Sequence, residues 1–575
     1  MKFSEMPYHR PDLEEFRRKY GQITEEFGKA RSAEKQYRLI LEHEKLSGDF
    51  ETMASIAYIR NSIDTTDPYY EAEMAFFDAN SPVANTYKQS FYKVVNASPF
   101  QTELEKRIGK LFFTNLALAL KAFSPETVGL QKKENALVTE YEKLLASAKI
   151  DFHNETLNLS EMQKYTISPD RAVRKEAWTK IAGFFTGNSK RLDEIYDELV
   201  KNRTEQAHKL GYKNYVQLGY DRLGRNCYGP EEVKAYRGQI VRDLVPMISR
   251  MKERQAKRLS LPGIKFWDDG CLFPDGNPAP KGGTQKLVDQ AQKMYHEMNP
   301  LTGEFFDFMK GNELFDLESK KGKAGGGYCT SIPGYKSPFI FSNFNGTAGD
   351  VEVLTHEAGH AFADYLSQGN PILETRSPTM DGAETHSMSM ELFSRPWDRL
   401  FFEEETKKFH QYQLEAALDF IPYGCLVDHF QTAMYENPDM TPDERKRTWL
   451  KLEHTYRPWI DFDEIPFFSV GGGYQRQHHI YSFPLYYIDY CLAQTTALEF
   501  WSASEKDWKE AFSRYLTFVR AGGTKDYVEL VTLADLELPF HDGCIKKLCA
   551  EINEFLASHQ AAEPAACLKQ NRDEP

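Results

Sequence analysis

Apolar residues recur every three to four positions along most of this chain, which is the period of an amphipathic helix. Such runs follow one another from Asp12 to about Ile150, and Ser32, Pro68 and Pro99 stand where three of them begin. Ser caps the first turn of a helix, and Pro fits the first helical position. The pattern therefore predicts an all-helical N-terminal lobe of antiparallel hairpins.

Helical patterns continue through the middle of the chain. Ser168-Pro169-Asp170 is a strong start signal, and the pattern predicts one helix from there to about Phe185 and a second over 191–210. The run Pro338–Phe344 predicts a strand that ends just before another helix. The preceding segment Gly325–Gly327 favours either a turn or a close backbone approach.

That next helix, expected to end before Gly369-Asn370-Pro371, has two different faces. At 100° per residue, six apolar residues share one side: Val351, Leu354, Ala358, Ala361, Phe362 and Tyr365. His356 and His360 lie on the opposite side. Gly359 stands beside them inside the helix, where Gly costs up to about 1 kcal/mol relative to Ala. A close approach by another element is therefore expected at Gly359.

The polar side of this helix carries the motif His356-Glu357-x-x-His360. Two histidines four residues apart can offer their imidazole nitrogens to one metal ion. Neutral imidazole suits zinc, and a zinc with three protein ligands keeps a position for a water whose pKa falls to roughly 7. Glu357 stands where it can take a proton from that water.

A third protein ligand must come from another part of the chain. A catalytic zinc needs a further carboxylate or histidine, and four downstream residues compete for this place: Glu374, Asp381, Glu384 and Glu391. A helix is expected to begin near Asp381, and Glu384 and Glu391 would share one of its faces. Residue chemistry alone leaves the choice open.

A second group of chemically active residues lies near the C-terminus. Pro484 is expected to open a helix that carries three tyrosines, with two histidines on the loop before it: Tyr486, Tyr487, Tyr490, His478 and His479. The Gly-rich stretch Gly471–Gly473 precedes this segment.

Composition narrows the class of protein. A chain of 575 residues with 41% hydrophobic and 27% charged residues is expected to form more than one globular lobe. The net charge of -14 argues against nucleic-acid and anionic-membrane partners, since phosphate binding needs a positive field. Residues 1–16 are polar, no apolar run of 18 residues occurs, and eight scattered cysteines form no dense framework. A cytoplasmic protein is expected, and its oligomeric state is unknown from sequence.

Together these motifs resemble the zinc oligopeptidases of the thimet oligopeptidase and oligoendopeptidase F family. The resemblance rests on His356-Glu357-x-Gly359-His360, on Glu384 followed by Thr-His-Ser, and on the run from His479 to Tyr490. That run looks closest to bacterial Pz-peptidase-like members. The resemblance covers roughly 168–557 and implies a mainly α fold: a two-lobed helical clamshell with a deep central channel and a small β-sheet beside the metal-binding helix. It also implies one Zn²⁺ per chain and short peptides as substrates.

Carried over residue by residue, the resemblance makes His356 and His360 the first two zinc ligands. Glu384 becomes the third ligand, and Glu357 becomes the general base. Glu391, seven residues beyond Glu384, is expected to accept a hydrogen bond from a ligand histidine and orient it.

The resemblance further implies that a histidine and tyrosines of the C-terminal segment contact the substrate and stabilise the oxyanion. His479 and Tyr487 are the expected catalytic residues, and His478 and Tyr490 are expected substrate contacts. The register between the two histidines is open, and Tyr487 and Tyr490 match the family better than Tyr486 does.

Two further positions are expected to lie along the substrate backbone. They are Gly326 and Asn343, on the edge to which a peptide could add as a strand. Phe483 stands where the family often has a tyrosine, which places one hydroxyl contact in doubt.

The sequence therefore predicts a zinc-dependent endopeptidase that hydrolyses internal bonds of short oligopeptides, with a zinc exopeptidase on a related helical scaffold as the alternative. The expected division is a helical N-terminal lobe over 1–200, a zinc-metallopeptidase domain over 201–557 and a flexible tail over 558–575.

Overall fold

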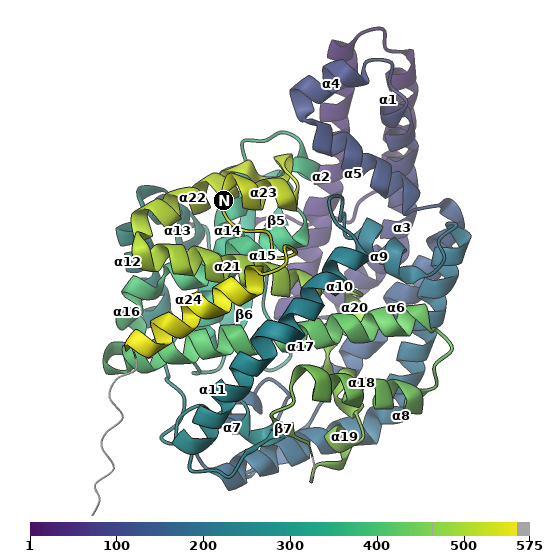
Figure 1. Cartoon of the computed structure of the whole chain (residues 1–575). Coiled ribbons are helices and arrows are strands. Elements are labelled where there is room, and N and C mark those ends of the chain that lie inside the picture. Colours follow the sequence, from purple (N-terminus) through teal and green to yellow (C-terminus); the bar gives the residue numbers. More distant parts are fainter. Residues whose placement is uncertain (463, 560–575) are drawn as a thin grey trace, which may run out of the picture.

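The computed structural model describes residues 1–462 and 464–559, and within them the fold is mainly α (Figure 1). The helices before the main sheet are α1 (Leu13–Lys29), α2 (Ala33–Ile63), α3 (Pro68–Asn96), α4 (Gln101–Ile108), α5 (Lys110–Lys121), α6 (Val128–Ala146), α7 (Gln163–Thr166), α8 (Arg171–Lys209), α9 (Tyr215–Arg222), α10 (Pro230–Gln239), α11 (Val245–Arg258), α12 (Thr284–Met298) and α13 (Pro300–Gly311). The mainly α class expected from the sequence is confirmed.

The helices after the sheet carry the residues singled out above. They are α14 (Gly349–Ser367), α15 (Met380–Phe393), α16 (Arg399–Phe402), α17 (Thr406–Glu436), α18 (Pro442–Tyr456), α19 (Pro466–Ser469), α20 (His478–Ser482), α21 (Ile488–Lys506), α22 (Trp508–Ala521), α23 (Tyr527–Leu533) and α24 (Cys544–His559). A single 3₁₀ turn, η6 (Leu373–Thr375), lies between α14 and α15.

The N-terminal helices begin where the sequence indicates. The side chains of Asp12, Ser32 and Asp67 accept hydrogen bonds from first-turn N–H groups of α1, α2 and α3. Helices α1, α2, α4 and α5 project beyond the rest of the molecule (Figure 1), and a separate apolar cluster joins them to the C-terminal half of α3. Ile372, just before η6, belongs to this cluster and joins it to the C-terminal part.

Two helix predictions were wrong. The two helices expected over 168–210 form one helix, α8, in which the exposed Gly187, in the expected gap between Phe185 and Arg191, causes no break. An isolated Gly costs only about 1 kcal/mol, and the buried residues of α8 on both sides of it outweigh that cost. Conversely, the run expected from Pro99 to about Ala122 divides into α4 and α5 at Gly109, whose φ of 107° ends a helix.

A small sheet lies against the helix that carries the histidines, as expected. Its strands are β4 (Phe315–Glu318), β5 (Tyr328–Ile332) and β6 (Ser337–Phe344), in the order β4-β6-β5. Strand β6 is parallel to β4 and antiparallel to β5, with Cys329 opposite Ile340. Two minor pairs complete the described strands: β1 (Ile150–Phe152) with β2 (Glu155–Leu157), and β3 (Ile264–Lys265) with β7 (Ile460–Asp461).

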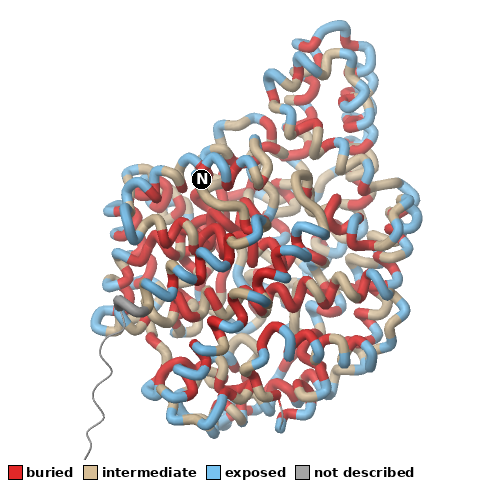
Figure 2. Tube along the Cα trace, in the orientation of Figure 1, coloured by how far each residue is buried: buried red, intermediate tan, exposed pale blue. Residues whose placement is uncertain are grey.

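The most deeply buried helices lie behind this sheet. The five residues Val351, Leu354, Ala358, Ala361 and Phe362 of the apolar stripe on α14 are buried, and Tyr365 is partly buried. Helix α15 is buried on all sides from Asp381 to Met390, and it packs on α14 and α21. Figure 2 shows the buried segments gathered in the middle of the molecule. The residues singled out on α14 and α15 thus lie in the deeply buried part of the fold.

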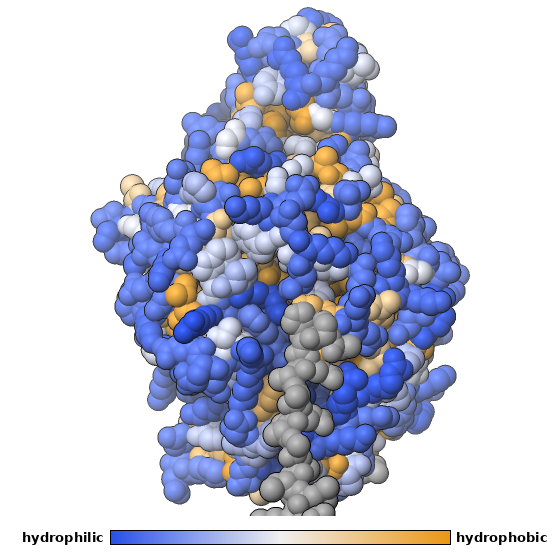
Figure 3. All heavy atoms as spheres, turned by 60° about the vertical axis from the view of Figure 1, so that its left-hand side comes forward, coloured by the Kyte–Doolittle hydropathy of each residue, from blue (hydrophilic) through white to orange (hydrophobic). Residues whose placement is uncertain are grey.

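The remaining predictions concern the domain boundary, the C-terminal tail and membrane-spanning helices. Helix α8 runs through residue 200 without interruption, so the boundary proposed there stays a prediction. Of the expected tail, 560–575 lie outside the described residues, and α24 extends to His559. Among the described helices, none has a stretch long and apolar enough to cross a bilayer. On the face drawn in Figure 3, apolar residues form small separate patches among hydrophilic ones.

Candidate active site

Helix α14 presents His356 and His360 to the same point. The Nε2 atom of each imidazole lies 3.2 Å from Oε2 of Glu384, and each histidine side chain is about 20% exposed. Glu384 is on α15 and is only 3% exposed. Of the four acidic residues considered from the sequence, the structure brings Glu384 together with both histidines.

The close contact between the two helices depends on Gly359. A Cβ atom at this position would lie 2.6 Å from Cα of Ser387 and 2.7 Å from the carbonyl oxygen of His386, both on α15. Any side chain would therefore push α15, and Glu384 with it, away from the histidines. The close approach expected from the sequence at Gly359 is confirmed.

Hydrogen bonds behind the three side chains fix their orientation. Nδ1 of His356 lies 2.7 Å from Oε1 of Glu391, so that Nδ1–H donates to this carboxylate and the Nε2 lone pair points toward Glu384. Ser387 Oγ donates to Oε2 of Glu384 at 2.9 Å. Glu391 thus takes the orienting position expected for it.

The electrostatics of this cluster keep Glu384 ionised. Burial acts to raise the pKa of Glu384, but the neighbouring imidazoles of His360 and His356 outweigh it and hold that pKa well below its usual range. Burial likewise opposes the charged form of His356, yet Glu384 and Glu391 raise its pKa well above the usual value. The cluster offers two imidazole nitrogens and one carboxylate oxygen that converge on one point. This donor set fits a divalent transition metal.

The other two candidates for a third ligand lie elsewhere. Asp381 accepts hydrogen bonds from Tyr228 Oη at 2.7 Å and from the Thr379 hydroxyl. Glu374 is on η6, where it contacts His43. Neither carboxylate is part of the His356, His360 and Glu384 cluster.

Glu357 is buried beside the cluster, at 6% exposure. Burial is the main cause that raises the pKa of its carboxyl group. A Cβ atom at Gly327 would lie 3.7 Å from Oε1 of Glu357 and 3.4 Å from the carbonyl oxygen of Phe341. The glycine at 327 therefore keeps a side chain out of the space next to this carboxyl group.

Gly326 and Asn343 lie together near the C-terminal end of β6. The amide Nδ2 of Asn343 donates to the carbonyl oxygens of Ala324 and Gly326, each at 2.8 Å. Gly326 has a φ of 86°, a conformation that favours glycine. Asn343 thus fixes the glycine loop. Its strand β6 lies between β4 and β5, so the expected position on an edge strand was wrong, and its contact with a substrate stays a prediction.

The C-terminal segment differs from its predicted form. His478 and His479 lie in the short helix α20 and not on a loop, and Pro484 does not open a helix. Leu485 has a φ of 65°, so the chain turns there and α21 begins only at Ile488. Tyr486 and Tyr487 therefore precede the helix, and only Tyr490 lies on it.

The two histidines point in different directions. His478 stacks on Tyr141 of α6, with 41% of its side chain exposed. His479 faces the tyrosines, and its Nε2 lies 3.3 Å from the Tyr490 hydroxyl. Burial lowers the pKa of His479 to about 3, so this imidazole is neutral. The structure thus joins His479, and not His478, to the tyrosine group.

Tyr486, which matches the family less well than Tyr487 and Tyr490, contacts the histidine and glutamate cluster directly. Its hydroxyl donates to Oε1 of Glu384, the proposed metal ligand. Tyr487 instead packs its ring against Phe420 and Tyr423. Helical periodicity could not single out Tyr486, because this residue lies in the irregular turn before α21.

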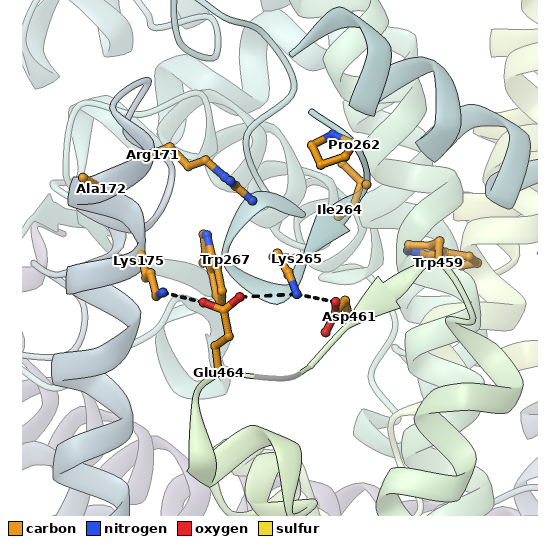
Figure 4. Close-up of a pocket in the computed structure, with 11 residues that line it drawn as sticks. Arg171, Ala172, Lys175, Pro262, Ile264, Lys265, Trp267, Trp459, Asp461 and Glu464 are labelled. Atoms are coloured by element: carbon orange, nitrogen blue, oxygen red, sulfur yellow. Dashed lines mark hydrogen bonds and ion pairs between the residues drawn. The ribbon is translucent and has the colours of Figure 1, made fainter. Parts of the chain in front are cut away.

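A pocket of about 620 Å³ lies apart from this cluster, between the start of α8 and the pair β3 and β7 (Figure 4). Its charged residues pair with one another: Glu464 contacts Lys175 at 2.5 Å and Lys265 at 3.4 Å. A smaller cavity of about 250 Å³ is lined by Phe420 and Tyr423, the residues that pack on Tyr487. Neither cavity contains a residue of the His356, His360 and Glu384 cluster.

Comparison with known proteins agrees with this geometry. Residues 3–123 match the peptidase M3 N-terminal domain and residues 285–549 match peptidase family M3. A solved structure titled Pz peptidase A with inhibitor 2 is 46% identical, with a TM-score of 0.96, and the match covers 97% of this chain and all of the other. A putative oligoendopeptidase F from Bacillus anthracis is 43% identical, with a TM-score of 0.91, over 97% of this chain and 99% of the other.

A curated relative extends the comparison. Oligopeptidase PepF of Bacillus subtilis is 20% identical over 546 residues, which is 88% of this chain and 78% of that protein. The matched regions include α14, α15 and α21 and hence every residue of the cluster described above. The chain is a peptidase, and it belongs to peptidase family M3, among the members that resemble oligoendopeptidase F.

Proposed function

We propose that this protein is a zinc-dependent endopeptidase that hydrolyses internal bonds of short oligopeptides. The observation that carries the proposal is the convergence of His356 Nε2 and His360 Nε2 on Glu384 Oε2, each at 3.2 Å, with the buried Glu357 beside them. Imidazole and carboxylate ligands favour zinc, and three protein ligands leave a position open.

Bound to these three side chains, zinc would supply Lewis acidity to the attacking water and to the scissile carbonyl group. Glu357 accepts the proton of the water as general base and later delivers it to the leaving nitrogen. Burial favours the protonated form of this carboxyl group, which suits a residue that must hold a proton between the two transfers. Gly327 leaves room next to Oε1 of Glu357 for the reacting groups.

The oxyanion is stabilised by hydroxyl groups of the C-terminal segment. We assign this role first to Tyr490, which His479 holds through the 3.3 Å contact, while Tyr486 fixes Glu384. Tyr487 stays the alternative donor. A neutral His479 can keep its contact with Tyr490 without adding charge to the site.

We propose that the substrate backbone lies along β5. Strand β5 is at one edge of the described sheet, paired only with β6, and it follows directly on the Gly325–Gly327 loop next to Glu357. An extended peptide added to this edge would be held by main-chain hydrogen bonds, which is compatible with a range of side chains. A channel between two lobes, as the resemblance implies, would restrict such substrates to short peptides. Nucleic acids and membranes are not proposed as partners.

The alternative is a zinc exopeptidase on the same scaffold. The two activities can be separated with an internally quenched peptide of about ten residues that is blocked at both ends. The purified protein is incubated with this peptide alone, with a chelator, and after zinc has been restored. Internal cleavage that chelator abolishes and zinc restores supports the proposal, with the products identified by mass. Trimming of a free peptide without cleavage of the blocked one supports the exopeptidase.

We place the enzyme in the cytoplasm, where the described cysteines, none of them in a disulfide, would stay reduced.

A further inference from the structure

A second group of metal-ligand side chains lies away from the candidate active site. It consists of His43 and Glu44 on α2 and Glu374 on η6. Nε2 of His43 lies 3.3 Å from Oε1 of Glu374 and 4.0 Å from Oε1 of Glu44. One imidazole nitrogen and two carboxylate oxygens thus face one another within 4.8 Å.

Two buried oxygen atoms of this group have no hydrogen-bond partner within the described residues. They are Oε1 of Glu44 and Oε2 of Glu374. Glu44 is 4% exposed, and its other oxygen already accepts the N–H of Leu373 at 2.8 Å. A buried carboxylate oxygen without a partner costs several kcal/mol, and a second carboxylate beside it adds repulsion. The arrangement therefore requires a positively charged occupant or a proton.

No described side chain donates a hydrogen bond to either of these two oxygens. Lys88 acts on the pair only through longer-range electrostatics, because its ammonium group pairs with Glu51 at 3.0 Å. Tyr92 donates its hydroxyl to Oε1 of Glu374 at 2.6 Å, which leaves Oε2 without a donor.

His43 is oriented as a metal ligand would be. Its Nδ1 lies 3.0 Å from the Tyr20 hydroxyl, so Nδ1–H can donate there and leave the Nε2 lone pair facing the carboxylates. The ring stacks on Phe91, with a centroid distance of 4.8 Å. Glu391 gives His356 the same kind of support in the candidate active site.

We propose that His43, Glu44 and Glu374 form a second site for a divalent transition-metal ion of the zinc and manganese type. The ion ties the N-terminal helices to η6, the turn that connects the two helices carrying the active-site ligands. The side chain of Glu374 is 29% exposed, which gives the ion a route from solvent. This site is independent of the proposed peptidase activity.

A proton is the competing occupant. Burial, and next the Glu374 carboxylate, raise the pKa of Glu44 well above its usual range. In the ion-free protein the two carboxyl groups can therefore share one proton, which binding of the ion would release.

The test is a metal count in the full chain with the active-site histidines removed. A His356→Ala/His360→Ala variant is equilibrated with Zn²⁺, and in parallel with Mn²⁺, passed through a desalting column and measured by plasma mass spectrometry. We expect it to keep about one equivalent of either ion, and a further Glu374→Gln or Glu44→Gln change to remove it. Glu42→Gln, a change of the same type at an exposed position of α2, is the control and keeps the ion.

Two further readouts guard against a variant that does not fold. Zn²⁺ should raise the melting temperature of the double-histidine variant but not that of its Glu374→Gln derivative. Anomalous scattering at the zinc edge in crystals of the unmutated protein should give a peak between His43 and Glu374. Less than about 0.2 equivalents of either ion in the double-histidine variant, or an ion that persists after Glu374→Gln, would overturn the proposal. A wild-type protein that loses its single ion only on Glu374→Gln would instead refute the active-site assignment.

Discussion

Replacing Gly359 by Ala separates helix propensity from helix packing, because the two effects have opposite signs. Propensity alone predicts that Ala stabilises α14 by up to about 1 kcal/mol. In the structure, however, the new Cβ would lie 2.6 Å from Cα of Ser387, whereas ordinary contact begins near 3.4 Å. The opposing atoms belong to the backbone of α15 and cannot rotate away. The two helices must therefore separate by roughly 0.8 Å.

That displacement acts directly on Glu384. A metal site tolerates errors of about 0.2 Å in its ligand distances, so a shift of this size should weaken zinc binding by about 10–100-fold, or roughly 1.4–2.8 kcal/mol. Overpacking costs about 1–3 kcal/mol, from which the gain in propensity must be subtracted. We therefore expect Gly359→Ala to lower both zinc affinity and thermal stability.

The assay is competition for zinc with a chromophoric chelator, together with thermal unfolding followed by circular dichroism. Gly183→Ala on α8 is the matched control, because a Cβ there would meet nothing within 4 Å. We expect that control to stabilise the protein by about 0.5–1 kcal/mol and to leave zinc affinity unchanged. If Gly359→Ala behaved like Gly183→Ala in both measurements, the packing argument would be refuted.

Three further predictions concern individual side chains. Glu357→Gln should keep zinc but lower kcat by about 10²–10⁴-fold, whereas His356→Ala should lose both; substantial turnover in metal-verified Glu357→Gln protein would contradict the role of base. Glu391→Gln should weaken zinc binding by about 10–100-fold, as measured by chelator competition, because His356 loses the charge of its orienting partner while the general base Glu357 stays in place. Tyr490→Phe should lower kcat by about 10²–10³-fold with little change in KM. If kcat falls in Tyr486→Phe and not in Tyr490→Phe, the oxyanion is stabilised by Tyr486 instead.

The helical class and the position of the reactive helix could be predicted from the residue pattern alone. Periodicity placed Val351, Leu354 and Phe362 on the buried face of α14 and the two histidines on the other face. These are local properties, since a 3.6-residue period and a four-residue ligand spacing can be read without knowing what packs against the helix. Gly359 even indicated that a neighbouring backbone would come close.

How distant segments meet depends instead on the packing of whole helices against one another. Four carboxylates were compatible with a third ligand, and the packing of α15 on α14 placed Glu384 there and Glu391 behind His356. Tyr486 entered the site because Leu485 turns the chain before α21, a backbone conformation that no periodicity predicts.

The same limit explains the helix boundaries and the second cluster. Whether a single Gly interrupts a helix depends on the free energy of packing on both sides of it, which can exceed the cost of the Gly itself. Gly187 inside α8 and Gly109 between α4 and α5 show the two outcomes. His43 and Glu374 are 331 positions apart, and the fold alone brings them to 3.3 Å. Spacing along a chain encodes contacts within one helix, whereas contacts between helices follow from the packing free energy of the whole molecule.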